Sequence, residues 1–238
     1  MTFFRSVLFF LWFAAISVAM HIAALPTIFL PRRAIVWTSR RWSQAMLWGL
    51  KVVAGLDYEV RGKIPREALL VAAKHMTMWD TIVLYLLLYD PAMVVKRELL
   101  SIPFYGWYIK KAGMIAIDRS AHASALRKMA QAARLVIAER RAIIIFPEGH
   151  RMKPGTPPDY KPGVAGLYAQ LGVACVPVAL NSGLFWTGFL KKRGHIVIEF
   201  LDAIPAGLKR AEFMRLLQDR TESATAKLVL EGRALLEA

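Results

Sequence analysis

A histidine and an aspartate five residues apart form the first pair in the chain with a clear chemical use. His75 and Asp80 lie in Lys-His-Met-Thr-Met-Trp-Asp, residues 74–80, directly after a short apolar run. A carboxylate bonded to one ring nitrogen fixes the histidine tautomer, and the other nitrogen can then act as a general base. A continuous helix would set the two side chains about 140° apart, so we expect His75 in the turn before a helix. The alternative is an ordinary turn histidine with Asp80 capping that helix.

Two further segments supply cations suited to an anion such as a phosphate. Lys96 and Arg97 open the segment 96–106, and Arg119 follows a second apolar run. Lysine offers a compact charge, and arginine offers a planar fork that can form two parallel hydrogen bonds with a phosphate. The alternative is a solvated basic surface, which is where most lone lysines and arginines lie.

A third segment joins an apolar run to a carboxylate, a glycine and a cation. Residues 142–146 lead through a proline into Glu148, Gly149 and Arg151. Glu148 can accept a hydrogen bond from a substrate hydroxyl, Gly149 allows close backbone approach, and Arg151 can bind an anion. A fourth block, Val-Pro-Val at 176–178, lies in a strand that can form one wall of a site.

In this order, the four blocks resemble the motifs of the glycerolipid acyltransferases, in particular the bacterial 1-acyl-glycerol-3-phosphate acyltransferases. The resemblance covers roughly residues 58–205, and H-x-x-x-x-D matches His75 and Asp80. The other matched positions are Lys96, Glu98, Leu99, Pro103, Gly106, Ile117, Asp118, Arg119, Phe146, Pro147, Glu148, Gly149, Arg151, Val176, Pro177 and Val178. Two positions depart from the pattern: Lys74 stands where Asn is common, and His150 stands where Thr or Ser is usual.

The resemblance implies acyl transfer from an acyl carrier protein or coenzyme A thioester to the sn-2 hydroxyl of lysophosphatidic acid. The product would be phosphatidic acid, in phospholipid biosynthesis. His75 would be the general base, held by Asp80. No cofactor beyond the thioester co-substrate and no metal ion are expected. The residues implied for substrate binding are Lys96, Arg119, Glu148, Gly149 and Arg151.

Two other functions remain as alternatives. The nearer is an acyltransferase of the same family that uses a lyso-ornithine lipid or another lysophospholipid as acceptor. The farther is a non-enzymatic basic module that binds membranes or nucleic acid. It accounts for the charge of the chain but not for four motifs in family order, so we expect no nucleic-acid partner.

Alternating strands and helices must position these residues. Short β-type runs at 58–61, 69–73, 93–96, 114–117, 142–146, 174–179 and 195–200 alternate with helical patterns at 80–88, 121–139, 163–171 and 208–236. This order predicts an α/β fold with a mixed, largely parallel sheet flanked by helices. The candidate site residues follow the predicted strands, at the carboxyl ends where parallel sheets form their binding sites. We assign residues 56–238 to this acyltransferase domain.

The segment before that domain predicts a membrane-associated helical hairpin over residues 1–55. Residues 6–31 carry no charged side chain and exceed the ~20 apolar residues that cross a bilayer core. A signal peptide is the alternative, but the apolar run continues past its weak small-residue site. In residues 33–53, helical spacing places basic side chains on one arc that is flanked by tryptophans. This pattern is typical of helices that lie in a membrane interface, and also of helices packed on a domain core.

Composition supports contact with an anionic membrane. Lys and Arg number 32 against 17 Asp and Glu, a net charge of +15, while 56% of the residues are apolar. This combination suits anionic membrane lipid and an acidic substrate. Arginines follow the apolar run, which predicts the inner membrane with the domain facing the cytoplasm. The single cysteine excludes an internal disulfide and a cysteine-based zinc cluster.

Overall fold

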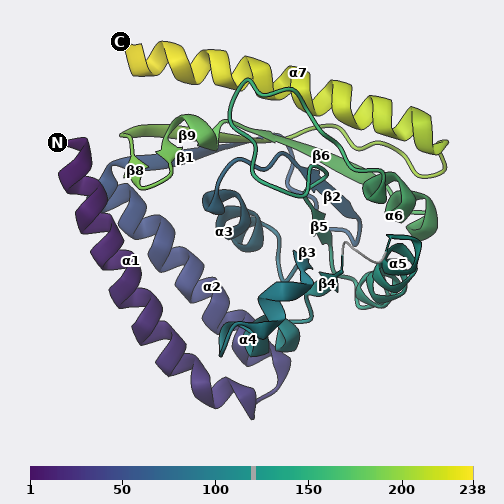
Figure 1. The fold of residues 1–238 in the computed structure, drawn as a ribbon, viewed down its shortest axis with the longest axis horizontal. Coiled ribbons are helices and arrows are strands. Elements are labelled where there is room, and N and C mark those ends of the chain that lie inside the picture. Colours follow the sequence, from purple (N-terminus) through teal and green to yellow (C-terminus); the bar gives the residue numbers. More distant parts are fainter. Residues whose placement is uncertain (119–121, 238) are drawn as a thin grey trace.

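A seven-stranded sheet forms the centre of the molecule. The computed structural model describes residues 1–118 and 122–237, and in them the strand order is β1-β9-β6-β2-β5-β3-β4 (Figure 1). Neighbouring strands run parallel, except that β6 and β9 are antiparallel. The strands are β1 (Leu56–Arg61), β2 (Leu70–Ala73), β3 (Ala92–Lys96), β4 (Ile115–Ile117), β5 (Ile143–Ile145), β6 (Cys175–Leu180) and β9 (Gly194–Phe200). The predicted mixed, largely parallel sheet is confirmed.

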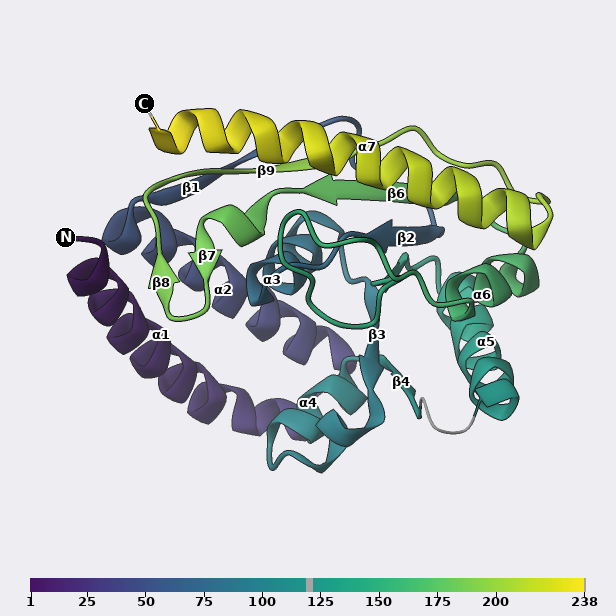
Figure 2. The same cartoon turned by 45° about the horizontal axis from the view of Figure 1, so that its top comes forward.

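Helices cover both faces of the sheet, so that successive residues of a strand enter different cores. In β2, Val71 and Ala73 pack in the core beneath α2 and α3, whereas Leu70 and Ala72 pack beneath α5 and α6. Figure 2 shows α7 lying across the sheet on the side away from α1 and α2. The helices are α1 (Thr2–Ala24), α2 (Arg32–Gly49), α3 (Met78–Leu87), α4 (Tyr105–Lys111), α5 (His122–Ala138), α6 (Gly163–Leu171) and α7 (Arg210–Glu237).

The two N-terminal helices form a hairpin that lies against the α/β domain. A 3-10 turn, Leu25–Ile28, joins α1 to α2. The two helices pack so closely that a Cβ atom on Gly49 of α2 would lie 2.0 Å from the indole nitrogen of Trp12. Both ends of α1 also bind the domain: the backbone N–H of Lys191 donates to Ser6 Oγ at 2.9 Å, and the Tyr108 hydroxyl donates to the His21 carbonyl at 2.8 Å.

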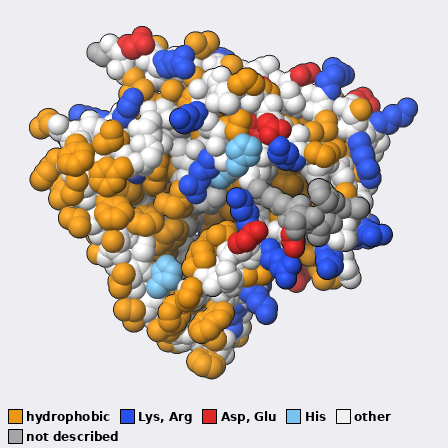
Figure 3. All heavy atoms as spheres, in the orientation of Figure 1, with side chains coloured by type: hydrophobic (Ala, Val, Ile, Leu, Met, Phe, Trp, Pro, Cys, Tyr) orange, Lys and Arg blue, Asp and Glu red, His pale blue; other side chains and the backbone are white. Residues whose placement is uncertain are grey.

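One outer surface of the molecule is strongly apolar. Figure 3 shows hydrophobic side chains gathered over α1 and continuing toward α4. Residues Thr2–Ile28 have the length and apolar composition of a membrane-crossing helix. The exposed large apolar residues of this surface include Phe3, Phe4, Phe10, Leu11, Val18, Ile22, Phe29, Phe104 and Trp107.

Candidate active site

The structure brings His75 and Asp80 together at the start of α3. One residue, Lys74, separates His75 from the end of β2, and Thr77 is the N-cap of the helix, with Asp80 in its first turn. Because His75 lies in the turn, its ring folds back, and Nδ1 lies 3.0 Å from Asp80 Oδ2. Asp80 also accepts the backbone N–H of Thr77 at 2.8 Å, as the acidic member of a capping box. One carboxylate therefore caps the helix and orients the histidine.

Asp80 is fully buried, and its hydrogen bonds come from donors that can stabilise a carboxylate. Its Oδ2 accepts the backbone N–H of Met76 at 2.6 Å, and its Oδ1 accepts the hydroxyl of Ser182 at 2.6 Å. The partial positive charge of the helix N-terminus adds to this stabilisation. An ionised Asp80 can accept only, so the bond to His75 requires a proton on Nδ1 and leaves Nε2 free to accept one.

The His75 ring is also held from its flat side. It stacks on Phe146 with the ring centroids 4.0 Å apart and an interplanar angle of 22°. The backbone N–H of Met152 donates to the His75 carbonyl at 2.8 Å. The side chain of His75 remains 12% exposed. The ring thus has a fixed orientation and remains partly accessible, as a general base requires.

Glu148 lies in the interior beside this pair, bound to a lysine. Lys74 Nζ donates to Glu148 Oε1 at 2.7 Å, and the two side chains are 2% and 1% exposed. Burial raises the pKa of the Glu148 carboxyl above its usual value, and the nearby Lys74 ammonium opposes this rise. Gly149 has a φ of +71°, and its N–H donates to the Phe146 carbonyl at 2.9 Å. This bond occupies the Gly149 N–H, so that group is not available to bind an oxyanion.

The other predicted anion-binding residues lie at the surface. Lys96 ends β3 and is exposed, and Arg151 is exposed in the loop after β5. In the described part of the chain, neither residue forms an ion pair. Asp159, in the same loop as Arg151, pairs with Lys161 at 2.5 Å. Arg119 lies outside the described residues.

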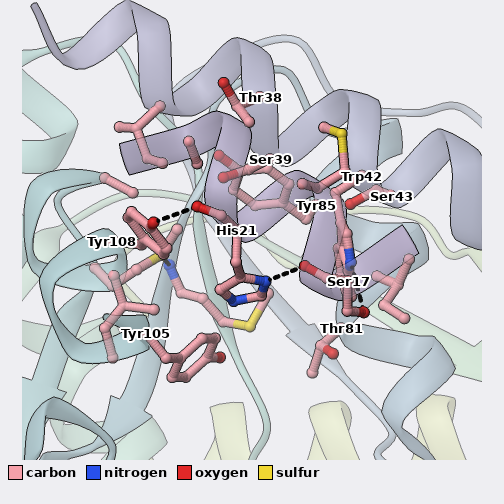
Figure 4. A pocket seen from close by; sticks show the side chains of 18 of the residues that line it. Ser17, His21, Thr38, Ser39, Trp42, Ser43, Thr81, Tyr85, Tyr105 and Tyr108 are labelled. Carbon is pink, nitrogen blue, oxygen red and sulfur yellow. Dashed lines mark hydrogen bonds between the residues drawn. The ribbon is translucent and has the colours of Figure 1, made fainter. Parts of the chain in front are cut away.

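An apolar cavity of about 430 Å³ lies between the N-terminal hairpin and the α/β domain. Met78, Thr81 and Ile82 bring α3 to its wall, on the helix that carries Asp80. Figure 4 shows polar lining groups bonded to one another, such as the His21 ring to the Ser17 carbonyl at 2.6 Å. The volume is that of a small-ligand pocket. Its lining residues come from four helices, β3 and the segment between α4 and β4, which are far apart in the sequence, so only the structure could reveal the cavity.

No group of three or more His, Cys, Asp or Glu side chains in residues 1–118 and 122–237 is arranged to hold a metal ion. Cys175 is buried within β6, and burial raises the pKa of its thiol well above the usual value. A buried thiol of this kind is a poor nucleophile.

Comparisons with known proteins agree with the motifs. The acyltransferase family model matches residues 57–181. A 1-acyl-sn-glycerol-3-phosphate acyltransferase of Pseudomonas aeruginosa is 32% identical over 196 residues, which cover 81% of this chain and 76% of that protein. One of Helicobacter pylori is 33% identical over 106 residues, 43% of this chain and 44% of that protein.

A solved structure shares the fold. The crystal structure of the 1-acyl-sn-glycerophosphate acyltransferase of Thermotoga maritima matches with a TM-score of 0.77 and 20% identity. The match covers 96% of this chain and 98% of that one. The family match over residues 57–181, together with the relative that is 32% identical over 81% of the chain, leads to one conclusion: the chain belongs to the acyltransferase family.

Proposed function

We propose that this acyltransferase moves a fatty acyl group from an acyl thioester to the sn-2 hydroxyl of lysophosphatidic acid, giving phosphatidic acid. The observation that carries this proposal is the hydrogen bond between His75, in the turn before α3, and Asp80 in the first turn of α3, the helix that also lines the apolar cavity. The carboxylate that holds the base and part of the wall of an apolar pocket thus lie on one helix. The names of the two bacterial relatives support lysophosphatidic acid as the acceptor.

In the proposed reaction, His75 Nε2 takes the proton of the acceptor hydroxyl while Nδ1–H stays bonded to Asp80. The hydroxyl oxygen attacks the thioester carbonyl, and a tetrahedral intermediate forms. Its collapse breaks the carbon–sulfur bond, and the imidazolium returns the proton to the departing thiolate. The products are an ester and a free thiol, and no acyl-enzyme forms. The donor is an acyl carrier protein or coenzyme A thioester, with no other cofactor.

The cavity is the proposed site for the acyl chain. Several of its polar lining groups bond to each other or to backbone carbonyls, as Thr81 Oγ1 does to the Met78 carbonyl at 2.7 Å. The lining therefore presents mainly apolar surface, where each methylene removed from water contributes about 0.8 kcal/mol. Lys96, Arg119 and Arg151 are the proposed phosphate ligands, and Glu148 and Gly149 are proposed to position the acceptor.

The direct test is acylation in vitro by the purified protein. Acyl carrier protein and coenzyme A thioesters serve as donors, and lysophosphatidic acid, a lyso-ornithine lipid and other lysophospholipids serve as acceptors. Transfer to lysophosphatidic acid with the highest kcat/KM is expected. A clear preference for another lysolipid would contradict the proposed acceptor, and membrane binding without any transfer would contradict the proposed activity.

Replacing Arg151 should weaken use of the acceptor. Arg151 is exposed and unpaired among the described residues, so its guanidinium is available for two hydrogen bonds to a phosphate. Such a contact is worth about 1.5–3 kcal/mol, so Arg151→Ala should lower kcat/KM for the acceptor at least about tenfold. Arg151→Lys should recover only part of this loss. Steady-state kinetics with each substrate varied in turn will measure it, and a rise confined to the donor KM would refute the phosphate role.

We further propose that residues 1–55 hold the enzyme on the cytoplasmic leaflet of the inner membrane. Because both ends of α1 are bonded to the α/β domain, α1 would enter one leaflet beside the domain instead of crossing the bilayer alone. The net charge of +15 favours anionic membrane lipid. Arginines after α1, beginning with Arg32 and Arg33, support the cytoplasmic orientation of the domain.

Polar substitutions on the outer face of α1 should weaken membrane binding without unfolding the protein. Phe4, Leu11 and Val18 are exposed and seven residues apart, so they share one face. Burying one such side chain contributes about 1.5–3 kcal/mol, so changing all three to Gln should reduce binding to anionic liposomes more than tenfold. Flotation measures this. Leu230→Gln with Leu235→Gln, exposed on α7, is the control, and undiminished binding of the α1 variant would contradict the proposal.

A further inference from the structure

Lys74 is the most unusual residue near the site. It stands directly before His75, in a position where the resemblance leads us to expect Asn. Its backbone N–H donates to the Val178 carbonyl at 2.9 Å, which extends the β2–β6 pairing by one residue. Its side chain is only 2% exposed. A buried ammonium is costly unless it is paired and hydrogen-bonded, so its contacts show what holds it there.

The contacts of Lys74 join three separate parts of the chain. Its Nζ donates to Glu148 Oε1 at 2.7 Å and to both oxygens of Glu222, on α7, at 2.9 and 3.0 Å. These three bonds use the three protons of the ammonium. Glu222 Oε1 also accepts the hydroxyl of Tyr160 at 2.9 Å. Lys74 therefore links the motif strand, the C-terminal helix and the loop after β5.

These contacts also fix Glu148 relative to His75. The same two chain segments meet twice, because the His75 ring stacks on Phe146 while Lys74 holds Glu148 two residues further on. Lys74 occupies Oε1 of Glu148, whereas Oε2 is buried and has no hydrogen-bond partner within the described residues. A buried acceptor without a donor is unfavourable, and a substrate hydroxyl bound there would satisfy it.

We propose that Lys74 is a positioning residue, which holds Glu148 ionised and in one orientation so that Oε2 accepts a hydrogen bond from the acceptor lipid. This inference rests on the proposed function, in which Glu148 positions the acceptor. Lys74 itself touches no reacting atom. Its effect should therefore appear in the KM for the acceptor and should depend on the charge of Glu148.

The charges around Glu148 determine in which direction the loss of Lys74 would shift the pKa of Glu148. Lys74 and, more weakly, His150 lower the pKa of Glu148, while burial and Glu222 raise it. Tyr160 faces the same cluster from the loop, with its own pKa raised chiefly by burial. Without Lys74, Glu148 would titrate at a higher pH. Below that pH it would be protonated and would resemble glutamine, and above it the carboxylate would return.

The experiment compares Lys74→Met, Glu148→Gln and the double variant in acyl-transfer kinetics at several pH values. Each should raise the acceptor KM at least about tenfold near neutral pH, and the double variant should be no worse than Glu148→Gln alone. Raising the pH should restore the acceptor KM of Lys74→Met but not that of Glu148→Gln. The donor KM should change little in all three. Losses that multiply, or a Lys74→Met variant that does not recover at high pH, would overturn the proposal.

Matched variants separate the loss of the Lys74 charge beside Glu148 from a general loss of structure. Lys191→Met removes another buried lysine, and Glu231→Gln removes a carboxylate of α7 that pairs with Arg61; neither should alter the acceptor KM. If Lys74→Met does not fold, Lys74→Met/Glu222→Gln removes one of the two uncompensated carboxylates. Its acceptor KM should recover as the pH rises, and failure to recover at any pH overturns the proposal.

The acceptor panel distinguishes failure of this inference from failure of the proposed function. A wild-type enzyme that acylates another lysolipid contradicts the proposed acceptor, and the same variants then test Lys74 on that lipid. A wild-type protein that is inert with every acceptor contradicts the proposed function, and this inference with it. Wild-type activity combined with an unchanged acceptor KM in Lys74→Met refutes the role of Lys74 alone.

Discussion

His75→Ala should abolish acyl transfer while the protein stays folded and membrane-bound. The ring has a fixed orientation and a carboxylate partner, and it is partly accessible. A positioned general base contributes about 10²–10⁴ in rate, and alanine offers no substitute proton acceptor. Turnover with a saturating thioester donor measures the loss. Circular dichroism and liposome flotation should match the wild type, because the His75 side chain contacts the fold mainly through Phe146 and Asp80.

A second histidine variant serves as the control. His195 is exposed in β9, on the other side of β6 from the site, and His195→Ala should retain wild-type turnover. Near-normal turnover of His75→Ala would show that another group takes the hydroxyl proton and would overturn the proposed mechanism. A loss shared equally by both variants would point to general damage.

The order of strands and helices was predictable because β-branched runs and helical periodicity are local signals. Segments held only by distant contacts were missed. Helix α4 is short, and Gly106 within it packs so closely that a Cβ atom would lie 2.1 Å from the Leu100 carbonyl oxygen. The hairpin of β7 (Trp186–Thr187) and β8 (Leu190–Lys191) has strands of two residues each, held in part against α1. No local pattern predicts such elements.

The pairing of His75 with Asp80 was predictable from helix geometry, since only a turn lets the two side chains meet. Their wider surroundings were not. Ser182 reaches Asp80 from 102 residues away, and Glu222 reaches Lys74 from 148 residues away. Contacts across such sequence distances depend on how the sheet brings strand ends together, which spacing in the sequence does not reveal. The sequence marked Lys74 only as a departure from a motif.

Asp80→Asn decides between the two roles that one carboxylate combines here, capping α3 and stabilising the imidazolium. Asparagine can keep most of the geometry. Its carbonyl oxygen in the place of Oδ2 would still accept from His75 Nδ1 and the Thr77 N–H, and its amide would donate to the Ser182 hydroxyl. The negative charge is lost, so the imidazolium formed during transfer loses its counter-ion.

We therefore expect Asp80→Asn to fold normally and to lose about 10²–10⁴ in kcat, as expected when a general base works without its electrostatic partner. Asp80→Ala should lose activity to a similar degree and also stability, since removing a helix cap costs about 0.5–2 kcal/mol. Turnover and thermal unfolding, measured on both variants, separate the effects. If Asp80→Asn kept near wild-type turnover, the carboxylate would act only as a cap, and the proposed base would need no charge beside it. Activity that falls in both variants, with stability lost only in the alanine variant, identifies Asp80 as the charge that supports His75.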